Sequence, residues 1–232
     1  MTSSAVVIGA SGGIGGALAD VLEDEGHYDR VVRCARSGDS DISLDLEDEE
    51  SIATAAASLS EAPPPSLILV GTGILHDGPT GPEKTMRDLD AAWLTRNFAV
   101  NTIGPALVAK HFLPLMPKTG LVKFAALSAR VGSISDNRLG GWYGYRASKA
   151  ALNMMIRNLA IEHKRKNDRA IIVGLHPGTV DTPLSAPFQG NVPARQLFDP
   201  ERAALQLLDV LDGLKPADSG HIFAWDGEEI AP

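Results

Sequence analysis

The chain of 232 residues is poor in cysteine and aromatic residues, and it has no excess of positive charge. Cys34 is its only cysteine, so no disulfide can form within the chain and a reducing compartment is expected. The net charge of -8 argues against nucleic acid or an anionic membrane as the main partner. No apolar run reaches membrane-spanning length, and the first residues lack the basic start of a signal peptide. These absences predict a soluble cytoplasmic protein.

Several catalytic motifs are absent as well. The six histidines show no metal-ligand spacing, so no metal site is expected. A phosphate loop of the NTPase type needs lysine after its last glycine, whereas Gly15 is followed by Gly16 and Ala17. The Gly-x-Ser-x-Gly pattern at 9–13 matches a hydrolase elbow, but Ser11 follows the first expected strand rather than a later one. A hydrolase is therefore disfavoured.

Strand-like and helix-like segments alternate from end to end, which predicts a parallel sheet covered by helices on both faces. The expected strands are 5–8, 30–34, 42–44, 67–70, 121–127, 170–175 and 222–224. The expected helices are 14–25, 49–59, 91–113, 142–166 and 201–211. No repeat or shift in composition marks a second domain. The predicted fold class is therefore α/β, a single doubly wound domain (Rossmann fold) over residues 1–232, with a cofactor crossing the carboxyl ends of the strands.

A glycine-rich turn follows the first expected strand and precedes an amphipathic segment. It reads Gly9-Ala10-Ser11-Gly12-Gly13-Ile14-Gly15. Glycines here allow a tight turn, close approach of the backbone to phosphate groups, and close packing of helix on strand. The pattern predicts a cofactor cradle formed by Gly9, Ser11, Gly13, Ile14 and Gly15.

The end of the second expected strand bears on the identity of the cofactor. An acidic residue there would bind the adenosine ribose and favour NAD. The segment reads Arg33-Cys34-Ala35-Arg36-Ser37 and contains no acid. Arg36, with Arg33 as a second candidate, could pair with the 2′-phosphate of NADP(H). NADP(H) is favoured over NAD(H), and the alternative of two solvated arginines stays open.

Tyr145 and Lys149 lie one turn apart on a single expected helix face. A tyrosine with an ordinary pKa of about 10 is a poor base at neutral pH. A cation about 4 Å away, at an effective dielectric near 20, is worth roughly 4 kcal/mol. That energy corresponds to about three pKa units. We therefore expect Lys149 to lower the pKa of Tyr145, directly or through the cofactor ribose.

With both motifs present, the chain resembles the short-chain dehydrogenase/reductase family over nearly its whole length. The segments 132–137 and 226–230 are most similar to the branch of C-factor and sniffer-type carbonyl reductases. The resemblance implies a hydride transfer between NAD(P)H and a ketone or aldehyde, or the reverse oxidation. It also implies a homodimer or homotetramer formed through the long helices.

The resemblance assigns further site residues. Asn101 would hold a water in the proton relay, with Tyr145 as acid or base and Lys149 as its partner. The other residues implied to bind the cofactor are Asp45, Leu46, Gly73, Pro177, Gly178, Val180 and Thr182. The segment 184–198 would set the substrate, and its Phe188, Leu197 and Phe198 suggest an apolar one.

The chain departs from the family pattern at three places. Ile8 stands where threonine is usual, and 70–73 reads Val-Gly-Thr-Gly where the family has Asn-Asn-Ala-Gly. The serine that would hydrogen-bond the substrate carbonyl is replaced by Ala129. Ser128 is the favoured substitute and Ser133 the other candidate, although Ser128 serves only if the strand end is twisted or bulged. Ala129 also keeps open an alternative function, a C-factor-like nucleotide-binding signalling protein with little turnover.

Overall fold

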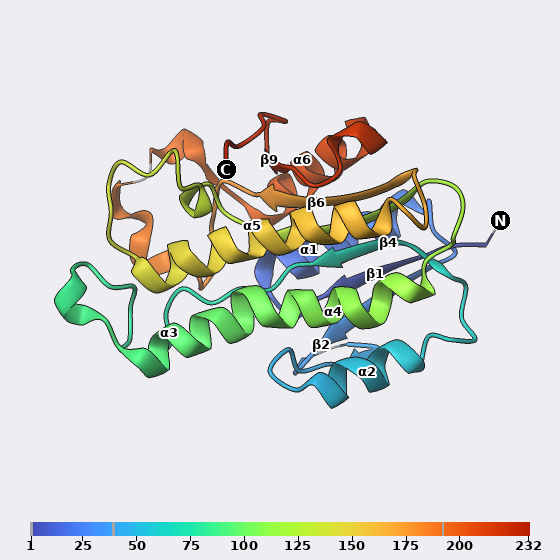
Figure 1. Ribbon diagram of the computed structural model, residues 1–232, viewed down its shortest axis with the longest axis horizontal. Helices are drawn as coiled ribbons and strands as arrows, with labels where there is room; N and C mark the ends of the chain where they lie inside the picture. Colours follow the sequence, from blue (N-terminus) through green and yellow to red (C-terminus); the bar gives the residue numbers. More distant parts are fainter. Residues whose placement is uncertain (1, 39, 192) are drawn as a thin grey trace.

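A seven-stranded sheet, parallel throughout, occupies the centre of the structure (Figure 1). This computed structural model describes residues 2–38, 40–191 and 193–232, so Met1, Asp39 and Val192 lie outside the described residues. The strands are β1 (Ser4–Ile8), β2 (Arg30–Ala35), β3 (Ile42–Ser43), β4 (Pro65–Val70), β5 (Val122–Leu127), β6 (Ala170–His176) and β9 (Ile222–Ala224). Their order is β3-β2-β1-β4-β5-β6-β9. Strands β2 and β3 are added on one side of β1, and the strands from β4 onward are added on its other side, so the order of strands reverses between β1 and β4. The Rossmann-like fold class predicted from the alternation of segments is confirmed.

Helices cover both faces of the sheet because side chains alternate along each strand. Val6 and Ile8 point to one face, where they pack in a cluster with α2, α4 and α5, while Ala5 and Val7 point to the other, beside α1 and α6. Figure 1 shows α4 and α5 lying side by side over the first of these faces. The α-helices are α1 (Gly13–Glu25), α2 (Glu49–Ala57), α3 (Ala91–Phe98), α4 (Gly104–Phe112), α5 (Tyr143–His163) and α6 (Pro200–Gly213). None of the helices in the described ranges has the length and apolarity needed to cross a bilayer.

The expected helix at 91–113 is interrupted. A π-helical turn, η2 (Ala99–Ile103), separates α3 from α4, and the Gly104 N–H bonds to the Ala99 carbonyl five residues back. Pro105 explains the irregularity, because proline has no N–H to donate to the Asn101 carbonyl and a regular helix cannot continue through it. The prediction of one unbroken helix was therefore wrong at the position that carries Asn101.

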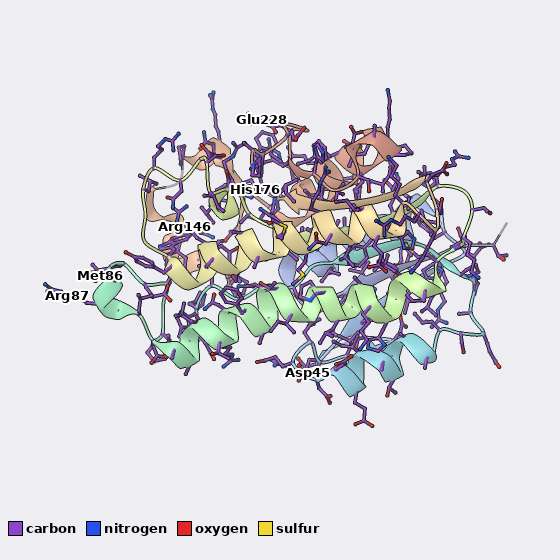
Figure 2. All side chains as sticks on the ribbon, viewed as in Figure 1. Asp45, Met86, Arg87, Arg146, His176 and Glu228 are labelled. Carbon is purple, nitrogen blue, oxygen red and sulfur yellow. The ribbon has the colours of Figure 1, made fainter. Side chains whose placement is uncertain are left out.

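The remaining short elements lie mainly in the connections at the two ends of the sheet. They are η1 (Met86–Asp88), η3 (Leu113–Leu115), η4 (Arg130–Gly132), η5 (Ala186–Asn191), η6 (Ala194–Gln196), η7 (Pro216–Asp218) and a small pair of strands, β7 (Thr179–Val180) with β8 (Leu197–Phe198). Figure 2 shows Met86 and Arg87 at the outer end of the connection between β4 and α3. The segment expected to set the substrate is thus partly ordered by pairing of β8 with β7.

The α6 helix offers a direct test of the packing, since Leu205 and Leu207 share one helix but not one environment. Leu207 is fully buried at 0% exposure, whereas Leu205 is 43% exposed. We expect Leu207→Ala to lower the free energy of unfolding by about 2–5 kcal/mol, because it leaves a cavity. Leu205→Ala should lower it by less than about 1 kcal/mol. Urea unfolding followed by circular dichroism measures both, and equal losses would contradict the placement of α6.

Candidate active site

Two adjoining cavities lie where β1 and β4 end, at the point where the strand order reverses. Each has a volume of about 310 Å³, and both are lined by Ser11, Gly12, Gly71, Thr72 and Gly73. The first, here the nucleotide cavity, extends toward the end of β2. The second, here the catalytic cavity, extends toward α5 and the end of β6. Crevices at such a reversal are where doubly wound sheets bind ligands.

The glycine-rich turn forms the floor shared by the two cavities. Gly9 has a φ of 86°, which only glycine adopts without strain. A Cβ on Gly15 would overlap the Gly9 carbonyl oxygen, and one on Gly13 would lie 2.7 Å from Cγ2 of Thr182. Gly12 precedes α1 without a side-chain cap, so the first N–H groups of the helix face the cavity without a side-chain partner. The turn thus offers backbone donors to an anion.

The nucleotide cavity gathers several of the expected cofactor residues. Its lining includes Gly9, Ser11, Arg36, Asp45, Leu46 and Gly73. Arg36 Nη1 lies 3.9 Å from Glu47 Oε2, and the Arg36 side chain remains mostly exposed. Arg33 is instead held by Glu23 and Asp20 on α1, through N···O contacts of 2.7–3.0 Å. Of the two candidate arginines, only Arg36 faces the nucleotide cavity.

The start of α5 is held by a residue distant in sequence. Glu83 is buried, and its Oε2 accepts a hydrogen bond from the Gly144 N–H at 3.1 Å. The Glu83 carbonyl also accepts from the Trp142 N–H. Trp142, which precedes α5, has a φ of 50° and is the one non-glycine residue of the described chain with a positive φ. A carboxylate at a helix N-terminus is favourable, and here it fixes the turn just before Tyr145.

Tyr145 and Lys149 both line the catalytic cavity, together with Ser128, Pro177 and Thr182. Lys149 is 2% exposed, and its Nζ donates to the Leu127 carbonyl at 2.8 Å and lies 5.8 Å from the Tyr145 ring centre. Burial raises the pKa of Tyr145 to about 12. Burial also lowers the pKa of Lys149 from 10.5 to about 7.

These directions correct the expectation that Lys149 by itself lowers the pKa of Tyr145. Removal from water disfavours the phenolate, and the same removal disfavours the ammonium that was to stabilise it. In the protein chain alone, proton affinity at this pair is set by desolvation.

Asn101 lies just below the catalytic cavity and is fully buried. Its Oδ1 accepts from the Ile74 N–H at 2.8 Å, and its Nδ2 donates to the Ile74 carbonyl at 2.9 Å and to Ser148 Oγ at 3.1 Å. A Cβ on Gly73 would sit 3.4 Å from Asn101 Oδ1 and 3.6 Å from Lys149 Nζ. The π turn therefore connects α3 and α4 to the end of β4 and to α5.

The two candidate serines have different surroundings. Ser128 lines the catalytic cavity, but its Oγ donates to Asn153 Oδ1 at 2.6 Å. Ser133 Oγ lies 3.5 Å from Ser135 Oγ and 3.4 Å from the Pro232 carbonyl, and Ser133 does not line the cavity. Position therefore favours Ser128 over Ser133, although the Ser128 proton is already shared.

Aromatic side chains from separate segments meet beside Tyr145. The Trp142 ring centre lies 6.3 Å from that of Tyr145 and 5.2 Å from that of Phe188. Phe188 in turn lies 6.0 Å from His76, whose Nε2 is 3.0 Å from the Pro183 carbonyl. These rings, here the aromatic wall, form a continuous series of contacts that ends at Tyr145.

Three of the residues predicted to bind the cofactor line neither cavity: Gly15, Gly178 and Val180. Gly15 packs against Gly9, and Gly178 and Val180 pack against Phe198. Phe198 itself is buried with its ring 4.7 Å from Trp225, so it belongs to the core and not to a substrate surface. Four other predicted cofactor residues do line the catalytic cavity: Gly13, Ile14, Pro177 and Thr182.

Several lining residues were missed from the sequence. They include Ser37, Thr72, Ile74, Arg96 and Val100 in the nucleotide cavity and Pro183 in the catalytic cavity, whereas Leu184 belongs to the segment predicted to set the substrate. Arg96 and Val100 lie one helical turn apart, so their spacing could have placed both on one face of the helix. Glu83 and Asn153 carried no signal, because their partners are distant in sequence.

Comparison with known proteins agrees with this geometry. A family profile described as short chain dehydrogenase matches residues 3–192. The chain belongs to this family. It is an oxidoreductase of the short-chain type, as the resemblance implied.

Individual relatives share much of the chain. It is 32% identical to 1-hydroxy-2-glutathionyl-2-methyl-3-butene dehydrogenase from Rhodococcus sp. (strain AD45), over 97% of both proteins. It is 36% identical to C-signal from Myxococcus xanthus, over 68% of this chain and 89% of the relative. Among solved structures, NADPH-bound carbonyl reductase from chicken fatty liver has a TM-score of 0.85 at 25% identity, covering 100% of this chain and 94% of that one. Carbonyl reductase Sniffer of D. melanogaster has a TM-score of 0.84 at 21% identity with full coverage of both, which shows the fold.

The burial of Lys149 predicts a pH-dependent stability. Because its pKa in the folded chain is about 7 rather than 10.5, the unfolded chain binds more protons at this site between those pH values. Burial of Lys149 therefore lowers the free energy of unfolding most strongly below pH 7, and this loss of stability shrinks as the pH rises toward 10.5. We expect Lys149→Met to be more stable than the parent near pH 7, with a difference that shrinks at higher pH. Urea unfolding at a series of pH values measures it, and a difference independent of pH would contradict the assignment.

Proposed function

We propose that the chain is an NADP(H)-dependent oxidoreductase that reduces a ketone or aldehyde to an alcohol, or catalyses the reverse reaction. The main support for this proposal is that Tyr145 and Lys149 line one cavity with the glycine-rich turn. A bare nucleotide-binding module would need the turn but not a buried phenol and amine beside it. We treat residues 1–232 as a single NAD(P)-binding domain, and assembly into a homodimer or homotetramer stays a prediction.

The residues present fit a nicotinamide dinucleotide. Thr72 Oγ1 is buried in the wall shared by both cavities and has no hydrogen-bond partner among the described residues. The first N–H groups of α1 and the side chain of Ser11 face the same space. Gly73 leaves room between Asn101 and Lys149. When bound, the nicotinamide would supply or accept the hydride.

The chain's own residues would then transfer the proton and hydrogen-bond the carbonyl oxygen. The Tyr145 hydroxyl, which is protonated at neutral pH, would donate its proton to the oxygen that becomes negative during reduction. Lys149, anchored to the Leu127 carbonyl, would bind the ribose and return a proton to Tyr145. Asn101, held by Ile74 and Ser148, would keep a water in the relay from Lys149. Ser128 would donate to the carbonyl oxygen after releasing Asn153.

The preference for NADP(H) rests on Arg36. It faces the nucleotide cavity from the end of β2, beside Ser37, with no acidic residue in the strand end itself. A guanidinium suits a phosphate because it offers paired N–H donors. The 25% identical carbonyl reductase from chicken fatty liver is NADPH-bound, which supports the same cofactor here.

The aromatic wall favours an apolar substrate. Trp142, at the start of α5, contacts Tyr145, and Phe188 of η5 contacts Trp142. Pro183 and Leu184 extend this surface along the catalytic cavity. A small carbonyl compound with an apolar or aromatic body would cover these side chains and leave its oxygen near Tyr145.

A signalling protein with little turnover is the second candidate. Ala129 stands at the serine position, the Ser128 proton is shared with Asn153, and the chain is 36% identical to C-signal. The retained Tyr145 and Lys149 oppose this reading, because nucleotide binding alone does not require them.

Replacement of the tyrosine tests the enzyme directly. We expect Tyr145→Phe to lower the rate of NADPH oxidation by about 10²–10⁴-fold against any ketone, aldehyde or quinone that the parent reduces, because the proton donor is lost. NADPH binding, followed by protein fluorescence, should be unchanged. If the parent binds NADPH tightly but reduces none of the ketones, aldehydes and quinones tested, the signalling protein would be favoured instead.

The two serines are distinguished by paired variants. Ser128→Ala should lower kcat by about 10²–10³-fold, equivalent to roughly 2.7–4 kcal/mol, if its hydroxyl stabilises the carbonyl oxygen. Ser133→Ala is the matched control and should leave kcat within about twofold. A loss in Ser133→Ala with none in Ser128→Ala would reverse the assignment.

Arg36 gives a prediction about cofactor choice. We expect Arg36→Ala to weaken NADPH binding by roughly ten- to hundredfold, since a hydrogen bond to a charged group contributes about 1.5–3 kcal/mol. NADH, which lacks the 2′-phosphate, should bind the variant as it binds the parent. Calorimetric titration of both nucleotides measures this, and equal losses would contradict the role of Arg36.

A further inference from the structure

We propose that Arg96 is a second cationic ligand of the dinucleotide, and that it binds the phosphate groups common to NADPH and NADH. This inference rests on the proposed function, because it assumes that the two cavities hold such a cofactor. Arg96 was not among the residues implied by the sequence motifs. Its assignment comes from its position, its incomplete hydrogen bonding and the charge of the cavity.

Arg96 lies in α3, one turn before Val100, and both residues line the nucleotide cavity. The same cavity is lined by Gly9, Ser11 and Gly12 of the glycine-rich turn. In this fold class the pyrophosphate sits at that turn, next to the first N–H groups of α1. A guanidinium that shares the cavity with the turn is therefore placed to meet the same anionic group.

The guanidinium of Arg96 is only partly satisfied by the protein. Nη1 lies 2.5 Å from Asp77 Oδ2. Nε is buried and has no hydrogen-bond partner in residues 2–38, 40–191 and 193–232. A buried donor left without an acceptor costs free energy, so such a group calls for an explanation. A turn of the side chain toward the cavity would bring this donor to a phosphate oxygen, and the planar guanidinium would then present paired donors to that phosphate.

Two of the residues that line the nucleotide cavity are cationic. Its charged lining residues are Arg36, Asp45, Glu47 and Arg96. Arg36 is proposed to bind the 2′-phosphate, and Arg33 does not line this cavity. Arg96 is thus the other guanidinium available to offset the pyrophosphate charge in a protein whose net charge is -8.

The test compares Arg96→Gln with Arg36→Gln by calorimetric titration of NADPH and NADH. We expect Arg96→Gln to raise the Kd of both nucleotides by the same factor, about tenfold. Arg36→Gln should raise the Kd of NADPH alone. Arg96→Lys should fall between the parent and Arg96→Gln, because lysine keeps the charge but not the paired donors.

Asp77→Asn separates ligand binding from a merely structural role. It removes the acidic partner of Arg96 while leaving the arginine in place. If Arg96 binds phosphate, Asp77→Asn should bind both nucleotides at least as tightly as the parent. If Arg96 serves only to hold the connection between β4 and α3, Asp77→Asn should weaken binding as Arg96→Gln does. That result would overturn the inference.

Other outcomes also decide the matter. An unchanged Kd in Arg96→Gln, or a loss confined to NADPH, would refute the role proposed for Arg96 while leaving the proposed function intact. A parent protein that binds neither nucleotide would refute both. Thermal unfolding of each variant, followed by circular dichroism, confirms that the compared proteins are folded.

Discussion

The site depends on one close approach of backbones. Gly15 of α1 packs against the carbonyl of Gly9, and a Cβ on Gly71 would lie 3.1 Å from the Gly15 Cα. Because these residues have no side chains, the first turn of α1 can rest directly on the ends of β1 and β4. The crevice at the reversal of the sheet therefore has a floor of N–H groups instead of side chains. The remaining functional side chains are arranged around that floor by the elements that follow it.

The sequence predicted those parts of the fold that depend on local chemistry. Alternating apolar segments located the strands, Gly26 ended α1 with a φ of 64°, and the spacing of Tyr145 and Lys149 placed both in one cavity. The π turn was missed because helical periodicity averages over a single extra residue. Contacts between distant segments were also missed: Glu83 binds the Gly144 N–H across 61 positions of the chain, and no local pattern encodes such a pair.

Burial acts on Tyr145 and Lys149 in a way that pairwise charge reasoning did not capture. The same packing that fixes Lys149 against the Leu127 carbonyl withdraws it from water and lowers its pKa. The same cause raises the pKa of Tyr145, one turn away. Around the pair, Asn101 and Ser148 are buried but hydrogen-bonded, so the polar interior is held by mutual contacts and not by solvent.

The π turn has a geometric consequence for the two halves of the helix that it joins. One extra residue in a turn rotates everything after it by about 100° around the helix axis. Without that rotation, Gly104 would no longer face Leu46, whose Cβ would lie 2.9 Å from a Cβ at position 104. Leu46 lines the nucleotide cavity, and Asn101 lies beside Gly73, which lines both cavities. The inserted residue thus acts as a phase shift that turns one helical segment toward Leu46 on one side of the break and toward Gly73 at the break itself.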